Sequence, residues 1–382
     1  MQWRRTGQAA AFVLAAALCD GVAIANHLTA VFLLDNEYRV DAAALGLLAT
    51  VSTMGYVATV VLCGSLADRC GRRRMTCAGA LTMALANLSL ATTASTPALV
   101  GGLLLKGIGA ALFWPALAGW LGEGVGPRAL PRRLAVYNLG WCGGQVVGMS
   151  AAGVFYRSIG ARASFALYSG VCLALIVLLV RLPAVVGGAA ADTADQPLPS
   201  TARERRQAWA ANFAGFFVLS ELRTLFAPFA RAQLGLGPEM VGLLLATMTA
   251  LQLAMFLLLG LIRPRWATGR GLLPAQAAVV AGLLLLATGS SGGAASGLLA
   301  TGLLIGISNT ASLFHSMCGR DDPSRQSGIH EALLGSASIL GPVLGGLCAA
   351  WWGPAAPWWL GAVVTLAALA PYARRAQPAP MN

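Results

Sequence analysis

Apolar residues dominate this chain in long runs, which short polar segments separate. A helix needs roughly 20 apolar residues to cross about 30 Å of membrane hydrocarbon. Twelve runs are long enough, so the pattern predicts an all-α integral membrane protein with twelve membrane-spanning helices. The expected spans are 9–34, 43–66, 75–94, 97–121, 133–156, 160–182, 208–231, 239–262, 271–290, 293–318, 326–350 and 354–373.

The composition agrees with a membrane protein, and the charge distribution predicts its orientation. The chain is 57% hydrophobic and 10% charged, with a net charge of +12. Of its 26 basic residues, Lys106 and Arg223 lie within spans, and Arg39, Arg157, Arg162 and Arg231 lie on one side. All the others fall on the opposite side, as the positive-inside rule requires of cytoplasmic segments. We therefore expect both termini in the cytoplasm, the lipid bilayer as a partner, and no nucleic acid.

The N-terminal span shows no sign of signal-peptide cleavage, and the cysteines show no pattern of metal binding. The N-terminal stretch "MQWRRTGQAAAFVLAAALC" lacks a small-x-small cleavage site, and its apolar run continues past Asp20, so it is interpreted as a span. The eight cysteines contain no CxxC pair and lie mostly within spans. They are interpreted as small packing residues, and no metal site, disulfide or cofactor is expected.

The chain divides into two parts that resemble each other. Residues 183–206 form the only long polar stretch and predict a flexible cytoplasmic linker between a bundle at 1–182 and a bundle at 207–382. The repeated matches between the parts are Gly46-Leu47-Leu48 with Gly242-Leu243-Leu244 at an offset of 196, and Arg132 with Arg325, Gly148 with Gly341 and Gly153 with Gly346 at an offset of 193. Such a parallel repeat predicts a substrate cavity between two six-helix bundles, near the midplane.

One loop identifies a family resemblance. Between spans 2 and 3 the chain reads "GSLADRCGRRR", which matches G-x-x-x-D-R-x-G-R-R at every fixed position. In this the chain resembles the major facilitator superfamily, whose fold is two pseudo-symmetric six-helix bundles. The resemblance implies a cytoplasmic latch, closed in the outward-open state, formed by Gly64, Asp68, Arg69, Gly71 and Arg72. The second-half counterpart, "GLIRPRWATGRG", has no aspartate, so any latch is asymmetric.

Two other motifs of the family are incomplete here. In span 4, where proton-coupled members have R-x-x-Q-G-x-G-x-A, this chain has "LLLKGIGAA", with Leu103 at the arginine position and Lys106 at the glutamine position. In span 5, Met149 stands where the antiporter motif has proline, while "GPVLGG" (341–346) occurs in span 11. Both departures weaken a direct assignment as a proton antiporter.

Two carboxylates near the centres of spans are candidates for proton coupling. Asp20 in span 1 and Glu221 in span 7 stand at equivalent places in the two halves, allowing for one small gap. We therefore expect them to approach one cavity from opposite sides. Loss of hydration favours the neutral form of such a group, as a coupling site requires. The alternative is a static carboxylate held by a nearby cation.

The cationic groups within spans are candidates for the same cavity. Arg223 is two residues from Glu221, so the two side chains point to different faces, and Arg223 is expected to reach another helix or an anionic substrate. Lys106 is expected to pair with Asp20, with Glu221 or with an anionic substrate; the alternative is snorkelling towards the outer interface. His27 lies seven residues after Asp20 and is either a proton relay or hydrogen-bonded to a backbone carbonyl.

A second polar group is expected at the cytoplasmic mouth. His330 and Glu331 lie about one turn into span 11, and the repeat places them opposite Tyr137 and Asn138 of span 5. His315 is close enough in sequence to join them. This network of Asn138, His330, Glu331 and His315 is interpreted as a gate or brace, with a proton site as the alternative.

The side chains of the spans favour some transport functions over others. An aromatic and methionine-containing wall favours amphipathic cargo, so the leading hypothesis is proton-coupled export of a small amphipathic compound by alternating access. The alternatives are uptake of an organic anion bound by Lys106 and Arg223, and a non-transporting receptor or scaffold. The resemblance implies a monomeric efflux antiporter of a bacterial inner (cytoplasmic) membrane. An enzyme is not expected, because "IHEALLG" lacks the second histidine of a zinc-protease motif. The chain contains no ATP-binding loop, so ATP-driven transport is not expected either.

Overall fold

The computed structural model of the 382-residue chain describes residues 6–63, 69–93, 95–122, 130–182, 201–261, 269–317 and 323–373. Gly64 and Asp68 of the predicted latch, and residues 183–200 of the predicted linker, lie outside the described residues.

The first half of the chain, up to residue 182, consists of helices joined by short non-helical segments in its described residues. Its elements are α1 (Thr6–Phe32), the π-helix η1 (Leu33–Glu37), α2 (Ala42–Cys63), α4 (Arg72–Thr92), α5 (Thr96–Gly122) and α6 (Leu130–Arg181). The long α6 contains both the fifth and the sixth predicted spans, which meet at Gly160. Gly160 has φ 77° and ψ 168°, a conformation that glycine adopts without the steric cost of a side chain, so the chain turns there with almost no loop.

The second half, from residue 201, follows the same pattern. Its elements are α7 (Ala202–Leu234), α8 (Pro238–Leu261), α9 (Gly269–Leu286), α10 (Ser291–Met317), α11 (Pro323–Trp352), α12 (Ala356–Ala367) and α13 (Ala370–Ala373). A capping box begins α7, in which the Thr201 hydroxyl accepts from the Glu204 backbone N–H and the Glu204 carboxylate accepts from the Thr201 backbone N–H. Gly235 in the left-handed conformation ends α7.

The helices account for the predicted spans. Among the described residues, nine helices are long and apolar enough to cross a membrane, and α6 is counted once although it contains two predicted spans. Two shorter apolar helices, Gly271–Leu286 and Ala356–Tyr372, coincide with the ninth and twelfth predicted spans. The chain is thus a multi-pass, all-α membrane protein, and the expected total of twelve depends on the kink in α6 and on these two shorter helices.

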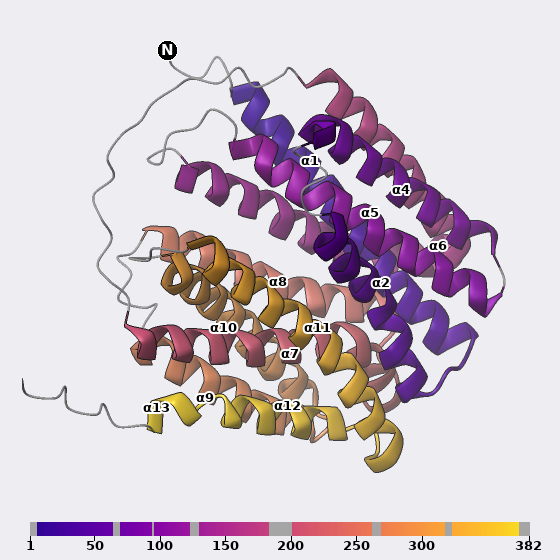
Figure 1. The fold of residues 1–382 in the computed structure, drawn as a ribbon. Helices are drawn as coiled ribbons and strands as arrows, with labels where there is room; N and C mark the ends of the chain where they lie inside the picture. The colour runs from indigo at the N-terminus through magenta and orange to yellow at the C-terminus, as the bar shows by residue number, and fades with distance from the viewer. Residues whose placement is uncertain are drawn as a thin grey trace, which may run out of the picture.

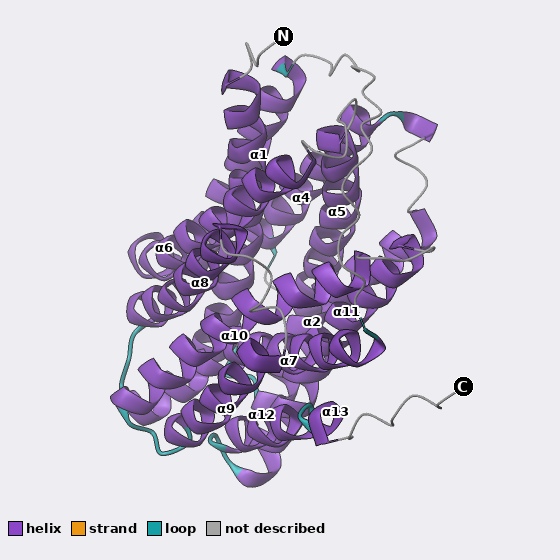
Figure 2. Ribbon diagram, turned by 90° about the vertical axis from the view of Figure 1, so that its left-hand side faces the viewer, coloured by secondary structure: helices purple, strands orange, loops and turns teal. Residues whose placement is uncertain are grey.

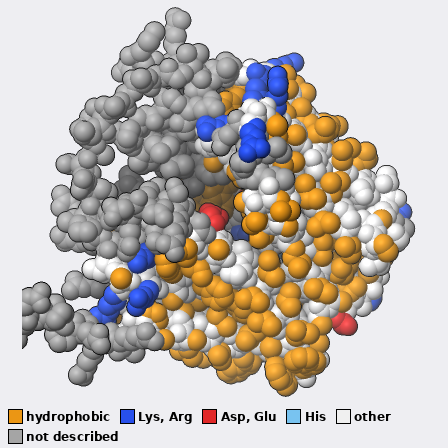
Figure 3. All heavy atoms as spheres, in the orientation of Figure 1, with side chains coloured by type: hydrophobic (Ala, Val, Ile, Leu, Met, Phe, Trp, Pro, Cys, Tyr) orange, Lys and Arg blue, Asp and Glu red, His pale blue; other side chains and the backbone are white. Residues whose placement is uncertain are grey.

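The two halves form separate groups of helices that meet along two seams. In Figure 1 the first-half helices, indigo to magenta, lie together above the second-half helices, which run from red to yellow. Figure 2 shows the same helices from the side, with no strand drawn among the described residues. Within the first half α1 packs on α6 and α4 on α5, while the halves meet where α6 packs on α8 and α2 on α11. Hydrophobic side chains cover much of the described surface in Figure 3, as contact with lipid requires.

Two ion pairs join the halves at one end of the molecule. We call the end where α1 begins the inner end, and the end where α1 finishes the outer end. At the outer end, Arg231 of α7 donates two hydrogen bonds to the Asp35 carboxylate of η1. Its Nε lies 2.9 Å from Oδ2, and its Nη2 lies 2.7 Å from Oδ1. Nearby, the Arg157 Nε of α6 lies 3.0 Å from the Glu239 Oε1 of α8.

Candidate functional site

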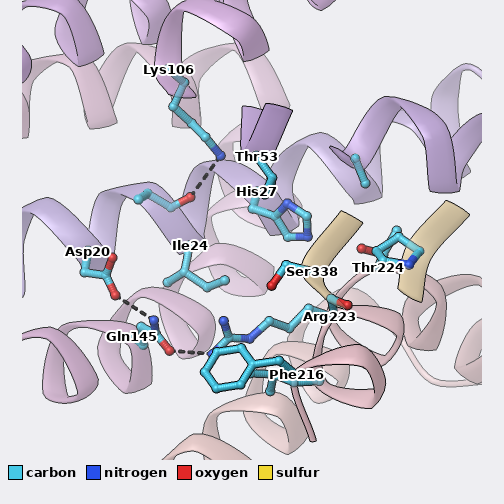
Figure 4. Close-up of a pocket in the computed structure, with 15 residues that line it drawn as sticks. Asp20, Ile24, His27, Thr53, Lys106, Gln145, Phe216, Arg223, Thr224 and Ser338 are labelled. Atoms are coloured by element: carbon cyan, nitrogen blue, oxygen red, sulfur yellow. Dashed lines mark hydrogen bonds between the residues drawn. The ribbon is translucent and has the colours of Figure 1, made fainter. Parts of the chain in front are cut away.

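A pocket of about 220 Å³ lies between the two halves (Figure 4). Side chains of α1, α2, α5 and α6 line one side, and side chains of α7 and α11 line the other. The lining residues are Asp20, Ala23, Ile24, His27, Ala49, Thr53, Lys106, Gln145, Phe216, Leu219, Ser220, Arg223, Thr224, Ser338 and Pro342. The pocket therefore contains four of the five expected in-span groups, Asp20, His27, Lys106 and Arg223.

A chain of hydrogen bonds crosses this pocket from one half to the other. The Gln145 Nε2 of α6 donates to the Asp20 Oδ2 of α1 at 2.6 Å. The Arg223 guanidinium of α7 donates to the Gln145 Oε1. Figure 4 shows the three side chains in this order. The amide of Gln145 thus links a carboxylate of the first half to a cation of the second half.

Close packing of α1 on α6 places Gln145 beside Asp20. A Cβ atom at Gly144 would overlap the Ala17 carbonyl oxygen, and one at Gly148 would overlap the Gly21 carbonyl oxygen. Only glycine permits so close an approach of the two backbones, as small residues do at many membrane helix interfaces. Since Gln145 follows Gly144 directly, the same contact brings its amide within reach of α1.

Lys106 enters the pocket from α5. Its side chain is buried, and its Nζ donates to the Ala23 carbonyl oxygen at 3.4 Å. In Figure 4 the ammonium points towards α1 and the other pocket residues. Together with Arg223 it gives the pocket two basic side chains against the single carboxylate of Asp20.

Glu221 does not reach this pocket, so the expectation that it shares one cavity with Asp20 does not hold in this structure. Its side chain is fully buried inside the second half, against Gly345 of α11 and Gly361 of α12. At the repeat offset of 196, the counterpart of Asp20 is Phe216, which does line the pocket. Glu221 follows Phe216 by five residues, which is about 140° around the helix axis, so it faces away from the pocket.

The repeat offsets also relate other pocket residues of the first half to pocket residues of the second half. His27 corresponds to Arg223, and both line the pocket. Gln145 and Ser338, related by the offset of 193, also both line it. The two repeat offsets therefore relate lining positions of the first half to lining positions of the second.

The described part of the latch motif contacts α5 at the inner end. Gly71 has φ 92° and directly precedes α4. Arg72 then donates from a guanidinium nitrogen to the Gly119 carbonyl oxygen at 2.7 Å. Arg69 is exposed. These contacts tie the start of α4 to the last turn of α5.

The residues expected at the cytoplasmic mouth are distributed over three helices. His330 of α11 is buried, and its Nδ1 lies 2.7 Å from the Ser312 hydroxyl of α10. His315 is buried beside Phe314, with ring centroids 5.2 Å apart. Glu331 is exposed. Asn138 lies in α6, but its side chain is outside the described residues, so the structure shows an α10–α11 contact and not the whole expected network.

Two features of the site were missed by the sequence analysis. Gln145 did not stand out as a site residue, because a lone glutamine near aromatic residues gives no sign of its partners. The outer ion pair of Asp35 with Arg231 was missed because charges at span ends are common, although these two residues also stand 196 apart. No group of three or more potential metal ligands occurs within the described ranges.

Comparisons with known proteins give a consistent result. A sequence profile described as the Major Facilitator Superfamily matches residues 13–328. Two crystal structures of a bacterial homologue of the human lysosomal transporter Spinster, both described as inward-facing, share 17% and 16% identity with TM-scores of 0.73 and 0.75, and each comparison covers 97% of both chains. A point mutant of the nucleoside transporter NupG shares 12% identity at a TM-score of 0.72, covering 95% of this chain and 99% of its own. A search of curated proteins found no match.

Proposed function

This chain belongs to the major facilitator superfamily and is a membrane transporter by fold, and we propose that it couples the movement of a small organic anion to protons by alternating access. The observation that carries the proposal is the hydrogen-bonded chain from Arg223 through Gln145 to Asp20, which joins the two halves inside the pocket.

Asp20 is the proposed coupling group. As a carboxylate it accepts a charge-assisted hydrogen bond from Gln145 and holds the Gln145 oxygen towards Arg223. A proton on Asp20 removes that charge and weakens the connection between the halves. Protonation thereby changes the relative free energies of two arrangements of the halves, which is what coupling requires.

The charges of the pocket support an anionic substrate. Lys106 and Arg223 supply two positive charges, and Asp20 supplies one negative charge. Buried charges without a counter-charge are costly, so an anion that enters between Lys106 and Arg223 balances the pocket. This geometry favours the organic-anion hypothesis over the amphipathic-export hypothesis that the sequence alone placed first.

Export of an amphipathic compound is the second candidate. It is supported by the apolar part of the lining, where Ile24, Leu219 and Phe216 lie close to the charged groups. The related structures do not decide between the candidates, since NupG is described as a nucleoside transporter and others as peptide transporters.

For orientation, we propose that the inner end faces the cytoplasm of a bacterial cell, with the chain in the inner membrane. The arginine distribution supports this, because the latch arginines Arg69 and Arg72 lie at the inner end. The halves are joined by ion pairs at the outer end, which supports an inward-facing arrangement. A hollow with charged side chains is visible in Figure 3.

The test is flux in reconstituted vesicles with and without an imposed pH gradient, using a panel of labelled mono- and dicarboxylates and one neutral amphipathic dye. Wild type is expected to accumulate an anion when the gradient is present. Asp20→Asn is expected to lose the gradient dependence while keeping exchange of the same anion. Asp41→Asn, at an exposed carboxylate that caps α2 outside the pocket, is the matched control. Equal gradient dependence in wild type and Asp20→Asn would overturn the proposal.

A further inference from the structure

We propose that Glu221 is a second protonation site, located inside the second half and separate from the central pocket. Its role in transport rests on the proton coupling proposed above, whereas its protonation state in this conformation does not. The inference rests on three observations: Glu221 is buried, two glycines form the space around its carboxyl group, and that carboxyl group has no hydrogen-bond partner among the described residues.

The carboxyl group of Glu221 lies in a space formed by two glycines on neighbouring helices. A Cβ atom at Gly345 of α11 would be 2.6 Å from Oε1, and one at Gly361 of α12 would be 2.9 Å from Oε2. The other side chains near these two glycine positions are Leu225, Leu283 and Val218, which are apolar. The side chain is 0% exposed, so any larger residue at either glycine would displace the carboxyl group.

Within the described residues, neither carboxyl oxygen of Glu221 has a hydrogen-bond partner. Cys348 of α11 is a titratable group close enough to Glu221 to interact with it electrostatically. Arg223, two residues along α7, points instead into the pocket (Figure 4). An ionised carboxylate held in such surroundings is strongly unfavourable, because its lost hydration is not replaced. The neutral acid is the form that fits this conformation.

Other polar groups of the second half share this lack of partners. The buried side chains Gln276 of α9, Trp358 of α12 and Asn212 of α7 each have polar atoms without a hydrogen-bond partner among the described residues. Buried polar atoms of this kind are ordinarily satisfied by ordered water.

The position of Glu221 connects its proton to helix movement. It lies where α7, α11 and α12 meet. The opposite face of α7 lines the central pocket through Arg223, and α11 lines the same pocket through Ser338, two turns before Gly345. Loss of the proton leaves a carboxylate that needs water or a cation, and these helices must separate to admit either. The proton on Glu221 therefore stabilises the packing seen here, and its release favours another arrangement of the second half.

Infrared difference spectroscopy of the full-length protein in lipid, with pH steps as the probe, tests the protonation directly. A carbonyl stretching band of a buried carboxylic acid is expected at a pH where exposed carboxyl groups are ionised. Glu221→Gln is expected to remove this band while keeping the thermal unfolding midpoint, because the amide has nearly the same shape. The band is expected to remain in Glu239→Gln, the control at a partly exposed carboxyl group. A folded Glu221→Gln protein with an unchanged band would overturn the inference.

The role in transport is tested by proton counting in the vesicle assay. Glu221→Gln is expected to lower the number of protons moved per labelled anion by one, and Asp20→Asn to lower it independently. If only Asp20→Asn changes the count, Glu221 is not a coupling site, although the proposed function stands. If the infrared band depends on Glu221 but neither variant changes the number of protons moved per anion, the proposed proton coupling is wrong. The inference that Glu221 is protonated in this conformation then still holds.

Discussion

At the scale of single residues, the amide of Gln145 connects the two halves, because it donates to Asp20 and accepts from Arg223. Gln145→Leu keeps the side-chain volume but removes both bonds. A hydrogen bond to a charged group contributes about 1.5–3 kcal/mol, so the flux should fall roughly 10- to 100-fold. Initial rates in vesicles at matched protein content measure this. The control is Gln233→Leu, at an exposed position near the end of α7. Equal rates for wild type and Gln145→Leu would show that the bridge has no part in transport.

Lys106 is the residue that separates the two candidate substrates. If its ammonium binds an anion, Lys106→Met should raise KM for carboxylates by about 10- to 100-fold, in line with the loss of a charge-assisted bond. The KM of a neutral amphipathic dye should change far less. Lys106→Arg keeps the charge and should retain part of the affinity for carboxylates. A similar change in KM for both classes of compound would speak for a general packing role of Lys106.

At the scale of the elements, the contact of α1 with α6 determines whether the pocket forms. Gly148→Leu would place a side chain where the Gly21 carbonyl oxygen already lies. Overpacking of this kind costs typically about 1–3 kcal/mol. We expect a lower thermal unfolding midpoint in detergent and weaker flux. Gly143→Leu is the matched control on the same helix, since its Cβ would meet nothing within 4 Å. Similar midpoints for the two variants would contradict the tight contact.

The elements also show how far the sequence predicts this molecule. Hydrophobic runs determine where a helix crosses the bilayer, so the predicted spans coincide with described helices. They do not determine the rotation of a helix about its axis, where a shift of one residue means about 100°. The prediction that Asp20 and Glu221 share a cavity is therefore wrong for this structure. The offset of 196, which relates Gly46 to Gly242, makes Phe216 the counterpart of Asp20, and Phe216 lines the pocket. The partners of Gln145 could not be predicted, because they depend on contacts between three helices.

At the scale of the whole molecule, the outer-end ion pairs must separate whenever the pocket opens to the outside. The two pairs differ in burial. The Asp35 side chain is 7% exposed and accepts two bonds from Arg231, which is 42% exposed. In the other pair, Arg157 is 71% exposed and Glu239 is 33% exposed. Exposed pairs contribute little, about 0–1 kcal/mol. The pair of Asp35 with Arg231 should therefore be the main ionic contribution to closure at this end.

Charge removal and charge reversal test this contribution. Asp35→Asn weakens bonds to a charged group, which at about 1.5 kcal/mol shifts the population roughly tenfold towards outward-open forms. Spin labels at the exposed positions 162 and 233, in a background without the eight native cysteines, should then report longer distances. Combining Asp35→Arg with Arg231→Asp should restore the short distance, because the pair is re-formed with its charges exchanged. Glu239→Gln should change the distribution little. If the double reversal behaves like Asp35→Asn, the two residues act separately, and closure at the outer end depends on the packing of α2 on α11 and of α6 on α8.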